Sequence, residues 1–251
     1  MDNNELKLAV LIDADNVPYA HVRGMLEEIA KYGVPTFKRI YGDFTKPNLA
    51  GWKSVLLENA ITPIQQYGYT TGKNATDSAL IIDAMDILYT GEVDGFCIIS
   101  SDSDFTRLAT RLREAGKKVF GMGERKTPTP FIAACNKFIY IEILKKDQDE
   151  SPEKPTKTPR KTGVKKKAKV QDSLRELNHL ITESIQDIAE EDGWVFLGVL
   201  GNLILKKQPD FDPRNYNFKK LLDLLKSLPN VEIEERPSGK GNLSHFYARV
   251  R

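Results

Sequence analysis

The stretches LIDADN (11–16) and CIISSDSDF (97–105) share one arrangement, in which an apolar run ends in closely spaced aspartates. The first run begins upstream, as KLAVLID (7–13), and the second belongs to GFCIIS (95–100). Short, unbroken apolar runs of this kind are typical of strands buried on both faces, as in a parallel sheet. Ligands of parallel sheets bind beyond the carboxyl ends of the strands, which is where both groups of aspartates fall.

Outward from these two strands, apolar runs alternate with helical patterns. Predicted strands cover 7–13, 36–42, 62–68, 95–100, 117–123 and 138–142. Predicted helices cover 18–32, 48–60, 76–90, 104–116 and a short segment near 129–135. This alternation predicts an α/β fold with a mostly parallel sheet and helices on both faces.

The composition excludes several classes of protein. The chain has 251 residues, of which 40% are apolar and 29% charged, as expected for one large or two small globular domains. We expect no membrane segment, because no apolar run approaches the ~18 residues of a span, and no signal peptide, so that a cytoplasmic location is predicted. Two cysteines, Cys97 and Cys135, and three scattered histidines build neither a zinc site nor a disulfide framework.

A basic segment divides the chain. Residues 151–170 contain eight Lys and Arg, one Glu and three Pro, which leaves a net charge of −5 for the remaining residues. Burial of so few apolar side chains cannot offset the conformational entropy that the segment would lose on ordering. We therefore expect a disordered basic linker over 148–170, between one domain at 1–147 and another at 171–251. Two roles stay open for the linker, a soluble spacer and a non-specific contact to phosphates.

The second predicted domain, 171–251, has a winged-helix pattern. Helices are expected over 171–191, within 193–205 and within 211–228. Two alternating strands, 230–237 and 243–250, follow on either side of the turn SGKGN (238–242). Three helices followed by a hairpin often bind nucleic acid.

Four aspartates of the first domain are predicted to meet at the carboxyl edge of the sheet. Asp13, Asp102 and Asp104 follow strands, and Asp77 begins the helix at 76–90 on its core-facing side. On the opposite side of that helix, Asp83 and Asp86 are expected to be solvated. Like charges ~4 Å apart repel by roughly 4 kcal/mol per pair at an effective dielectric constant of 20, so a cluster of four calls for a cation, protonation or separation.

Oxygen ligands without nearby His or Cys select Mg²⁺ or Mn²⁺. The competing explanation is that each aspartate only caps a helix or favours its dipole. For any one of the four residues, helix capping is at least as good an explanation as a metal site. For all four together, it is the weaker explanation.

These motifs resemble the NYN domain of the PIN-like nucleases over about residues 6–142. The spacing of 64 residues from Asp13 to Asp77 and of 25 from there to Asp102 fits the resemblance. It implies a PIN-like fold in which Asp13, Asp77, Asp102 and Asp104 bind a divalent metal, directly or through water, for phosphodiester hydrolysis. It also implies that Asn16 orients a ligand or the scissile phosphate. The stretch TTGKNATD (70–77) departs from the tighter Gly-containing approach of many relatives.

Further residues are candidates for substrate contacts. Lys73 can touch a phosphate or be an ordinary surface lysine, which is slightly favoured. Ser101, with Ser100, can contact a phosphate, and Arg107 can contact RNA or pair with a carboxylate. Tyr41 and Tyr67 at strand ends can stack on bases, although core or rim positions are commoner for such aromatics.

The second domain resembles the LOTUS (OST-HTH) domain. The resemblance rests on GWVFLGVLGNLILKKQPDFDPRNYNFKKLLDLLKSL (193–228), with Asn217 where family members typically have Gly. Asn tolerates a left-handed backbone best after Gly. The resemblance implies RNA binding, with contacts from Arg214, Lys219, Lys220 or the turn around Lys240, or binding of protein partners.

The leading hypothesis is a metal-dependent ribonuclease whose C-terminal domain binds or positions RNA. The alternative is a non-catalytic RNA-binding or regulatory adaptor on a PIN-like scaffold. A phosphatase or nucleotide-binding protein fits less well, because the chain has neither a GxxxxGK[ST] loop nor a Gly-rich dinucleotide motif. DNA as substrate, endo- or exonucleolytic action and a homodimer stay open.

Overall fold

The computed structural model describes residues 5–67, 75–144, 163–237 and 244–251. The chain divides into two compact units, Met1–Pro152 and Glu153–Arg251. In the part of the chain that is described, no helix combines the length and the apolar character needed to cross a membrane.

A six-stranded parallel sheet forms the centre of the first unit. Its strands are β1 (Lys7–Asp13), β2 (Val34–Gly42), β3 (Thr62–Gln65), β4 (Gly95–Ile99), β5 (Lys118–Gly123) and β6 (Lys137–Tyr140). They lie in the order β3-β2-β1-β4-β5-β6, and every neighbouring pair is parallel. The predicted α/β fold is confirmed.

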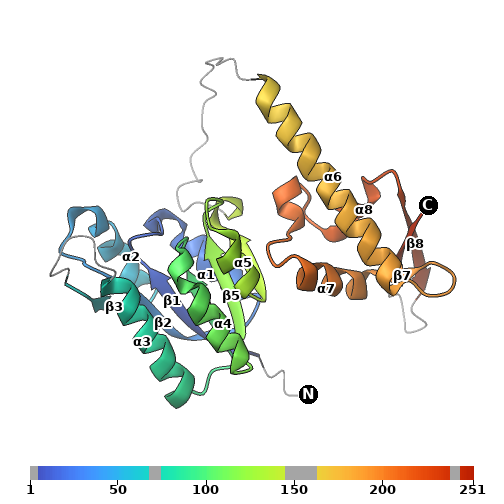
Figure 1. Cartoon of the computed structure of the whole chain (residues 1–251). Coiled ribbons are helices and arrows are strands. Elements are labelled where there is room, and N and C mark those ends of the chain that lie inside the picture. Colours follow the sequence, from blue (N-terminus) through green and yellow to red (C-terminus); the bar gives the residue numbers. More distant parts are fainter. Residues whose placement is uncertain (1–4, 68–74, 145–162, 238–243) are drawn as a thin grey trace. The chain divides into compact units, whose positions relative to one another are not determined.

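Helices cover both faces of this sheet (Figure 1). On one face lie α1 (Val22–Ile29) and α2 (Trp52–Glu58); on the other lie α3 (Ala75–Thr90), α4 (Thr106–Glu114) and α5 (Thr129–Ala134). Four short 3-10 segments accompany them at Tyr19–His21 (η1), Pro47–Leu49 (η2), Ser103–Phe105 (η3) and Ile141–Ile143 (η4). The result is a three-layer sandwich.

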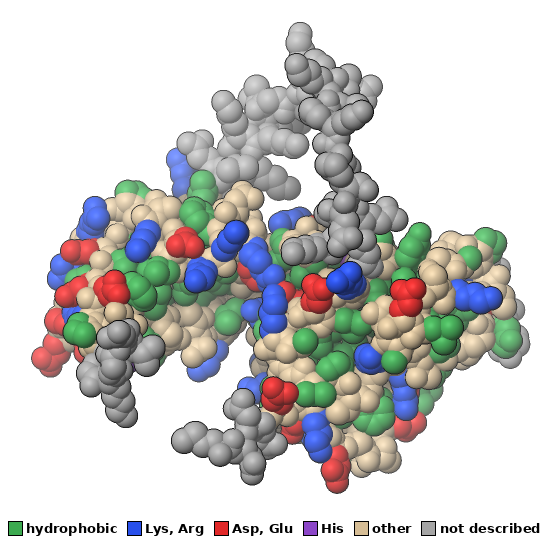
Figure 2. Space-filling view, turned by 180° about the vertical axis from the view of Figure 1, so that it is seen from behind, with side chains coloured by type: hydrophobic (Ala, Val, Ile, Leu, Met, Phe, Trp, Pro, Cys, Tyr) green, Lys and Arg blue, Asp and Glu red, His purple; other side chains and the backbone are tan. Residues whose placement is uncertain are grey.

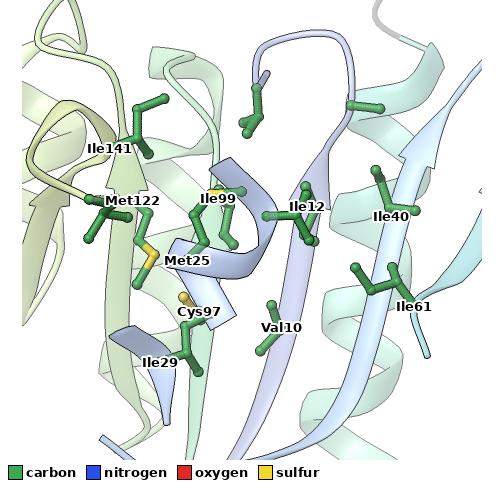
Figure 3. Close-up of a cluster of buried hydrophobic side chains, with 14 of the residues drawn as sticks. Val10, Ile12, Met25, Ile29, Ile40, Ile61, Cys97, Ile99, Met122 and Ile141 are labelled. Carbon is green, nitrogen blue, oxygen red and sulfur yellow. The ribbon is translucent and has the colours of Figure 1, made fainter. Parts of the chain in front are cut away.

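Side chains of the central strand β1 point alternately to the two faces of the sheet and pack into two separate cores. Val10 and Ile12 point to the α1 face, where they pack with Met25 (Figure 3), whereas Leu11 points to the core under α3 and α4. All residues of β1 except Lys7 are buried, because the strand is covered on both faces. This explains why KLAVLID is an unbroken apolar run rather than an alternating one.

The strand order reverses direction at the centre of the sheet. The chain moves outward from β1 to β3, then crosses through α3 to β4 on the other side of β1. At such a switch point the loops after the two central strands diverge, so a crevice opens beyond their carboxyl ends. The aspartates of LIDADN and SSDSD follow these two strands.

The second unit is a small helical domain with an antiparallel sheet. Its elements are α6 (Gly163–Ile188), β7 (Val195–Phe196), α7 (Leu197–Lys207), η5 (Pro213–Tyr216), α8 (Leu221–Lys226), β8 (Val231–Pro237) and β9 (Ser244–Val250). The strands lie in the order β7-β9-β8. Leu177, Ile181 and Ile185 of α6 pack against α7, α8 and the sheet in one core.

Several element bounds differ from the prediction by a few residues, and the largest difference is at the start of α6. Helix α6 begins at Gly163 rather than at residue 171, so 163–170 of the predicted linker is helical, while 148–162 lies outside the described residues. The helix expected within 211–228 is α8, which follows η5, and Asn217 between them has a left-handed backbone with φ 66°.

Candidate metal centre

Asp13 ends β1 as a buried carboxylate that holds three hydrogen bonds. The residue is only 1% exposed to solvent. Oδ2 accepts from Ser100 Oγ at 2.6 Å and from Asn16 Nδ2 at 2.8 Å, and Oδ1 accepts from the backbone N–H of Asp15 at 3.2 Å. Burial raises the pKa of Asp13, and the hydrogen bonds from Ser100 and Asn16 oppose that rise.

The pairing of β1 with β4 places Ser100 beside Asp13. Ile12 and Ile99 are partners in the register, so the next residue of each strand reaches the same edge. Gly123 of β5 keeps the following loop close, since a Cβ there would lie 2.5 Å from the Ser100 carbonyl oxygen. The Ser100 hydroxyl also accepts from the backbone N–H of Asp102 at 3.0 Å.

Asp102 and Asp104 stand at the start of the next helical segment. Asp102 is the N-cap of η3, and its Oδ1 accepts from the N–H of Asp104 at 2.9 Å. The fully buried Phe105 anchors this segment in the core. Capping is therefore a real role of Asp102, and it holds the residue at the edge of the sheet.

Asp77 approaches the same edge from the first turn of α3. One carboxylate oxygen from each of Asp77, Asp102 and Asp104 lies within 4.8 Å of the other two. The pKa of Asp77 is raised to about 6, first by burial and then by the negative charges of Asp13, Asp102 and Asp104. A helix start alone would favour the charged form, so burial and the neighbouring acids together outweigh that effect here.

The donor set fits a hard divalent cation. The three clustered ligand groups are all carboxylates, which suit Mg²⁺ and Mn²⁺ better than softer metals. A cation among them would relieve the repulsion that raises the pKa of Asp77. Asp13 is not one of the three clustered residues: it is buried at the end of β1, and its oxygens accept from Ser100, Asn16 and Asp15.

The other candidate residues of the first unit differ in their surroundings. Ser101 is buried, and its Oγ accepts from the N–H of Glu124 at 2.9 Å. Arg107 is exposed on α4, and among the described residues no hydrogen bond or ion pair joins it to the acidic cluster. Lys73 lies outside the described residues.

In the second unit, Arg214 is engaged within its own loop. Its Nη2 lies 2.6 Å from Oδ2 of Asp212, and its Nε lies 2.9 Å from Oδ1 of the same carboxylate, which is buried. Lys220 is exposed at the N-cap of α8. Lys219 beside it is also exposed, whereas Lys240 lies outside the described residues.

Asp83 behaves differently from the prediction. Instead of being solvated, it forms an ion pair with Arg39 and accepts a hydrogen bond from the Tyr41 hydroxyl. Tyr41 is fully buried in the core, which is the commoner position for such an aromatic, and it is not available for stacking on a base. Asp86 is exposed as predicted, and Tyr67 is 55% exposed.

Sequence reasoning also missed residues that share a cavity with Asn16. Tyr19 and Asn48 line a cavity with Asn16, yet they come from separate loops after β1 and β2. No motif connects them, because they become neighbours only when parallel strands bring their carboxyl ends together. The sequence indicates such residues only through the general rule that ligands of parallel sheets bind beyond the carboxyl ends of the strands.

Two solved structures are similar to parts of the chain. One is a protein of unknown function from Vibrio parahaemolyticus RIMD 2210633, with 21% identity and a TM-score of 0.47 over 56% of this chain and 96% of that one. The other is an uncharacterized protein from Nitrosomonas europaea, with 26% identity and a TM-score of 0.27 over 43% of this chain and 92% of that one. No curated protein matches the chain.

Family comparison is more informative. Residues 165–243 match the OST-HTH/LOTUS domain, which confirms the resemblance of the second domain. Residues 7–142, which include β1 to β6 and all four aspartates, match the NYN domain. The chain therefore belongs to the NYN domain family and carries a C-terminal OST-HTH/LOTUS domain.

Proposed function

We propose that this protein is a metal-dependent ribonuclease whose NYN unit hydrolyses RNA phosphodiester bonds and whose OST-HTH/LOTUS domain binds RNA. The observation that carries the proposal is the approach of Asp77, Asp102 and Asp104 oxygens to within 4.8 Å of one another. Such a concentration of negative charge opposes folding, so its presence at the switch point of the sheet points to a ligand. Membership of a PIN-like nuclease family supports the same reaction.

Asp77, Asp102 and Asp104 would hold Mg²⁺ or Mn²⁺, with the buried Asp13 at the same edge of the sheet. The bound cation would activate water and stabilise negative charge on the phosphate. Ser100 and Asn16 keep the Asp13 carboxylate in one orientation, since both donate to its Oδ2. Ser101 fixes the loop after β5 through the N–H of Glu124, and the exposed Arg107 is available to a phosphate.

RNA binding by the second unit is assigned to exposed lysines rather than to Arg214. Lys219 and Lys220 are exposed before α8, whereas the Arg214 guanidinium already binds the Asp212 carboxylate. On the face shown in Figure 2, Lys and Arg side chains are interspersed with Asp and Glu. Electrostatic attraction to RNA is then modest at any one place, and joining two weak binding units raises the overall affinity.

The test is cleavage of labelled single-stranded and structured RNA in Mn²⁺, Mg²⁺ or EDTA, with Asp102→Asn as the inactive variant. Asn is also a good N-cap, so this change keeps the start of η3 while it removes one ligand charge. Asp86→Asn, on the exposed side of α3, is the matched control. We expect metal-dependent cleavage by the wild type and by the control only.

Each other result has a definite meaning. Equal cleavage by Asp102→Asn and wild type identifies a contaminating ribonuclease. Binding of RNA without cleavage by any protein overturns the nuclease and favours the adaptor. Cleavage of DNA in preference to RNA overturns the proposed substrate.

A further inference from the structure

A cavity of about 320 Å³ opens at the carboxyl edge of the sheet, where Asp15 and Asn16 follow β1. Its walls come from the loops that follow β1, β2 and β5, and include Asp15, Asn16, Tyr19, Asn48, Trp52 and Glu124. Pockets for small ligands start at roughly this volume, about 300 Å³. The cavity therefore has the dimensions of a site for one small group, at the edge of the sheet where ligands of this fold bind.

Two hydrogen bonds connect the walls of the cavity to Asp13 and Ser101, at the ends of the two central strands. Asn16 lines the cavity and donates through Nδ2 to Asp13 at 2.8 Å. Glu124 lines it from the β5 loop and donates its backbone N–H to Ser101 Oγ at 2.9 Å. A group bound in the cavity would thus lie at the same edge of the sheet as the acidic cluster.

Tyr19 gives the cavity a flat and accessible aromatic wall. The residue is 42% exposed, and its ring lies directly against Gly51, where a Cβ would approach ring carbon Cε1 to 2.4 Å. Gly51 has an ordinary helical backbone, with φ −63° and ψ −22°, so the glycine is needed here for the close approach of the ring rather than for its own conformation. The absence of a side chain at Gly51 therefore allows the Tyr19 ring to occupy this position.

The charges of the cavity disfavour an anion. Asp15 and Glu124 contribute two carboxylates, and the one lysine of the wall, Lys126, is paired with Glu124 at 2.5 Å. The negative charge of the wall would repel a phosphate, whereas an uncharged ring would experience no net repulsion. The Asn48 amide, which also lines the cavity, can offer both a donor and an acceptor to the edge of such a ring.

We propose that this cavity is a nucleobase subsite, which takes one unpaired base of a single-stranded RNA next to the scissile phosphate. The base stacks on Tyr19, and Asn48 hydrogen-bonds its edge. Stacking on an aromatic side chain is the usual way in which proteins hold an unstacked base. The proposal rests on the proposed ribonuclease function and deepens it, because it makes single-stranded RNA the substrate.

The experiment combines abasic substrates with variants of the stacking wall. A single abasic nucleotide is moved stepwise through a labelled single-stranded RNA, and kcat and KM are measured for the full chain in Mn²⁺. We expect one position, at a fixed distance from the cut, where the missing base raises KM about five- to a hundred-fold. Tyr19→Ala should raise KM on intact RNA by a similar factor and cause no further loss on that abasic RNA.

Three further variants separate stacking from a general loss of structure. Tyr19→Phe keeps the ring and should behave as wild type, whereas Gly51→Ala should displace the ring and imitate Tyr19→Ala. Tyr89→Ala removes a tyrosine that is 70% exposed at the end of α3, and should leave KM unchanged. Thermal melting of every variant shows whether the fold is retained.

Binding to Asp102→Asn protein in EDTA separates this proposal from the ribonuclease proposal. We expect Tyr19→Ala in that background to weaken binding of intact RNA but not of the abasic RNA. Unchanged binding and unchanged KM in Tyr19→Ala overturn the subsite and leave the nuclease intact. Weakened binding by a protein that never cleaves supports the subsite and overturns the nuclease, and no RNA binding at all overturns both.

Discussion

The hydroxyl of Ser100 donates to Oδ2 of Asp13 over 2.6 Å, and the two residues are 87 positions apart in the chain. The bond joins the ends of the two central strands, at the place where the strand order reverses. The same hydroxyl accepts from the N–H of Asp102, so a buried serine links the innermost acid to the loop that carries two others. The arrangement of the candidate metal centre thus depends on a neutral residue.

Ser100→Ala should uncouple the acids without removing a charge. Asp13 would lose its shortest hydrogen bond while it stays buried, which costs about 1–3 kcal/mol of stability, and its pKa would rise further. We expect at least a tenfold loss of kcat together with weaker Mn²⁺ binding, measured by calorimetric titration. Ser103→Ala, three residues on and exposed, is the control and should match the wild type. Normal Mn²⁺ affinity in Ser100→Ala would contradict this role.

Asp77 should make the metal-free protein sensitive to pH. Its pKa is raised from the ordinary 3.8 to about 6 in the fold, so the native state holds this proton more tightly than the unfolded state does. The free energy of unfolding in EDTA should therefore decrease as the pH rises from about 4 to about 6, and the contribution of Asp77 should be constant above that range. Urea denaturation across this range measures the effect, and Asp77→Asn should flatten the profile.

Mn²⁺ binding should depend on pH in the opposite sense. A cation competes with the proton on Asp77, so its affinity should increase as the pH rises to about 6 and then level off. Asp77→Asn should melt at a higher temperature than wild type in EDTA near pH 7, since it removes one of the clustered charges. The same variant should gain little from Mn²⁺. A lower melting temperature in EDTA would show that repulsion in the cluster is negligible.

Much of the first unit can be predicted because its strands are continuous apolar runs. β1 has the predicted bounds, and the aspartates of the two central strands follow from the same pattern. The surroundings of Asp83 could not be predicted, because helical periodicity shows only which side of α3 faces its own core. The partners of Asp83 are Arg39 and Tyr41, which belong to β2 and are supplied by the tertiary fold.

Asp83 and Asp86 therefore make a matched pair, three positions apart on α3. Asp83→Ala leaves the buried Tyr41 hydroxyl without its acceptor and Arg39 without its partner, so we expect a loss of about 2–3 kcal/mol. Asp86→Ala, on an exposed position, should change stability by less than about 0.5 kcal/mol. Equal effects in chemical denaturation would mean that the Asp83 contacts contribute no net stability. Neither variant should alter Mn²⁺ affinity.

In the second unit, the extent of the helix within 211–228 was harder to predict. The residues of 211–228 have a helical pattern of apolar side chains, but Asn217 ends η5 with φ 66°, a conformation that most residues avoid. The periodicity of apolar side chains indicates which face of a helix is buried. It does not reveal that a single residue, Asn217, has a left-handed backbone. The substitution of Asn for the Gly typical of this family preserves that conformation.

Asn217 thus allows a test of backbone preference alone. Asn217→Gly should stay within about 0.5 kcal/mol of wild type, because easier access to positive φ is offset by a more flexible unfolded chain. Asn217→Val should lose about 1–2 kcal/mol, since a β-branched residue is strained at φ 66°. Asn202→Ala, at an exposed position inside α7, is the control and should be neutral or slightly stabilising. Calorimetry of the full chain measures all three, and a neutral Asn217→Val would mean that the turn rearranges at no cost.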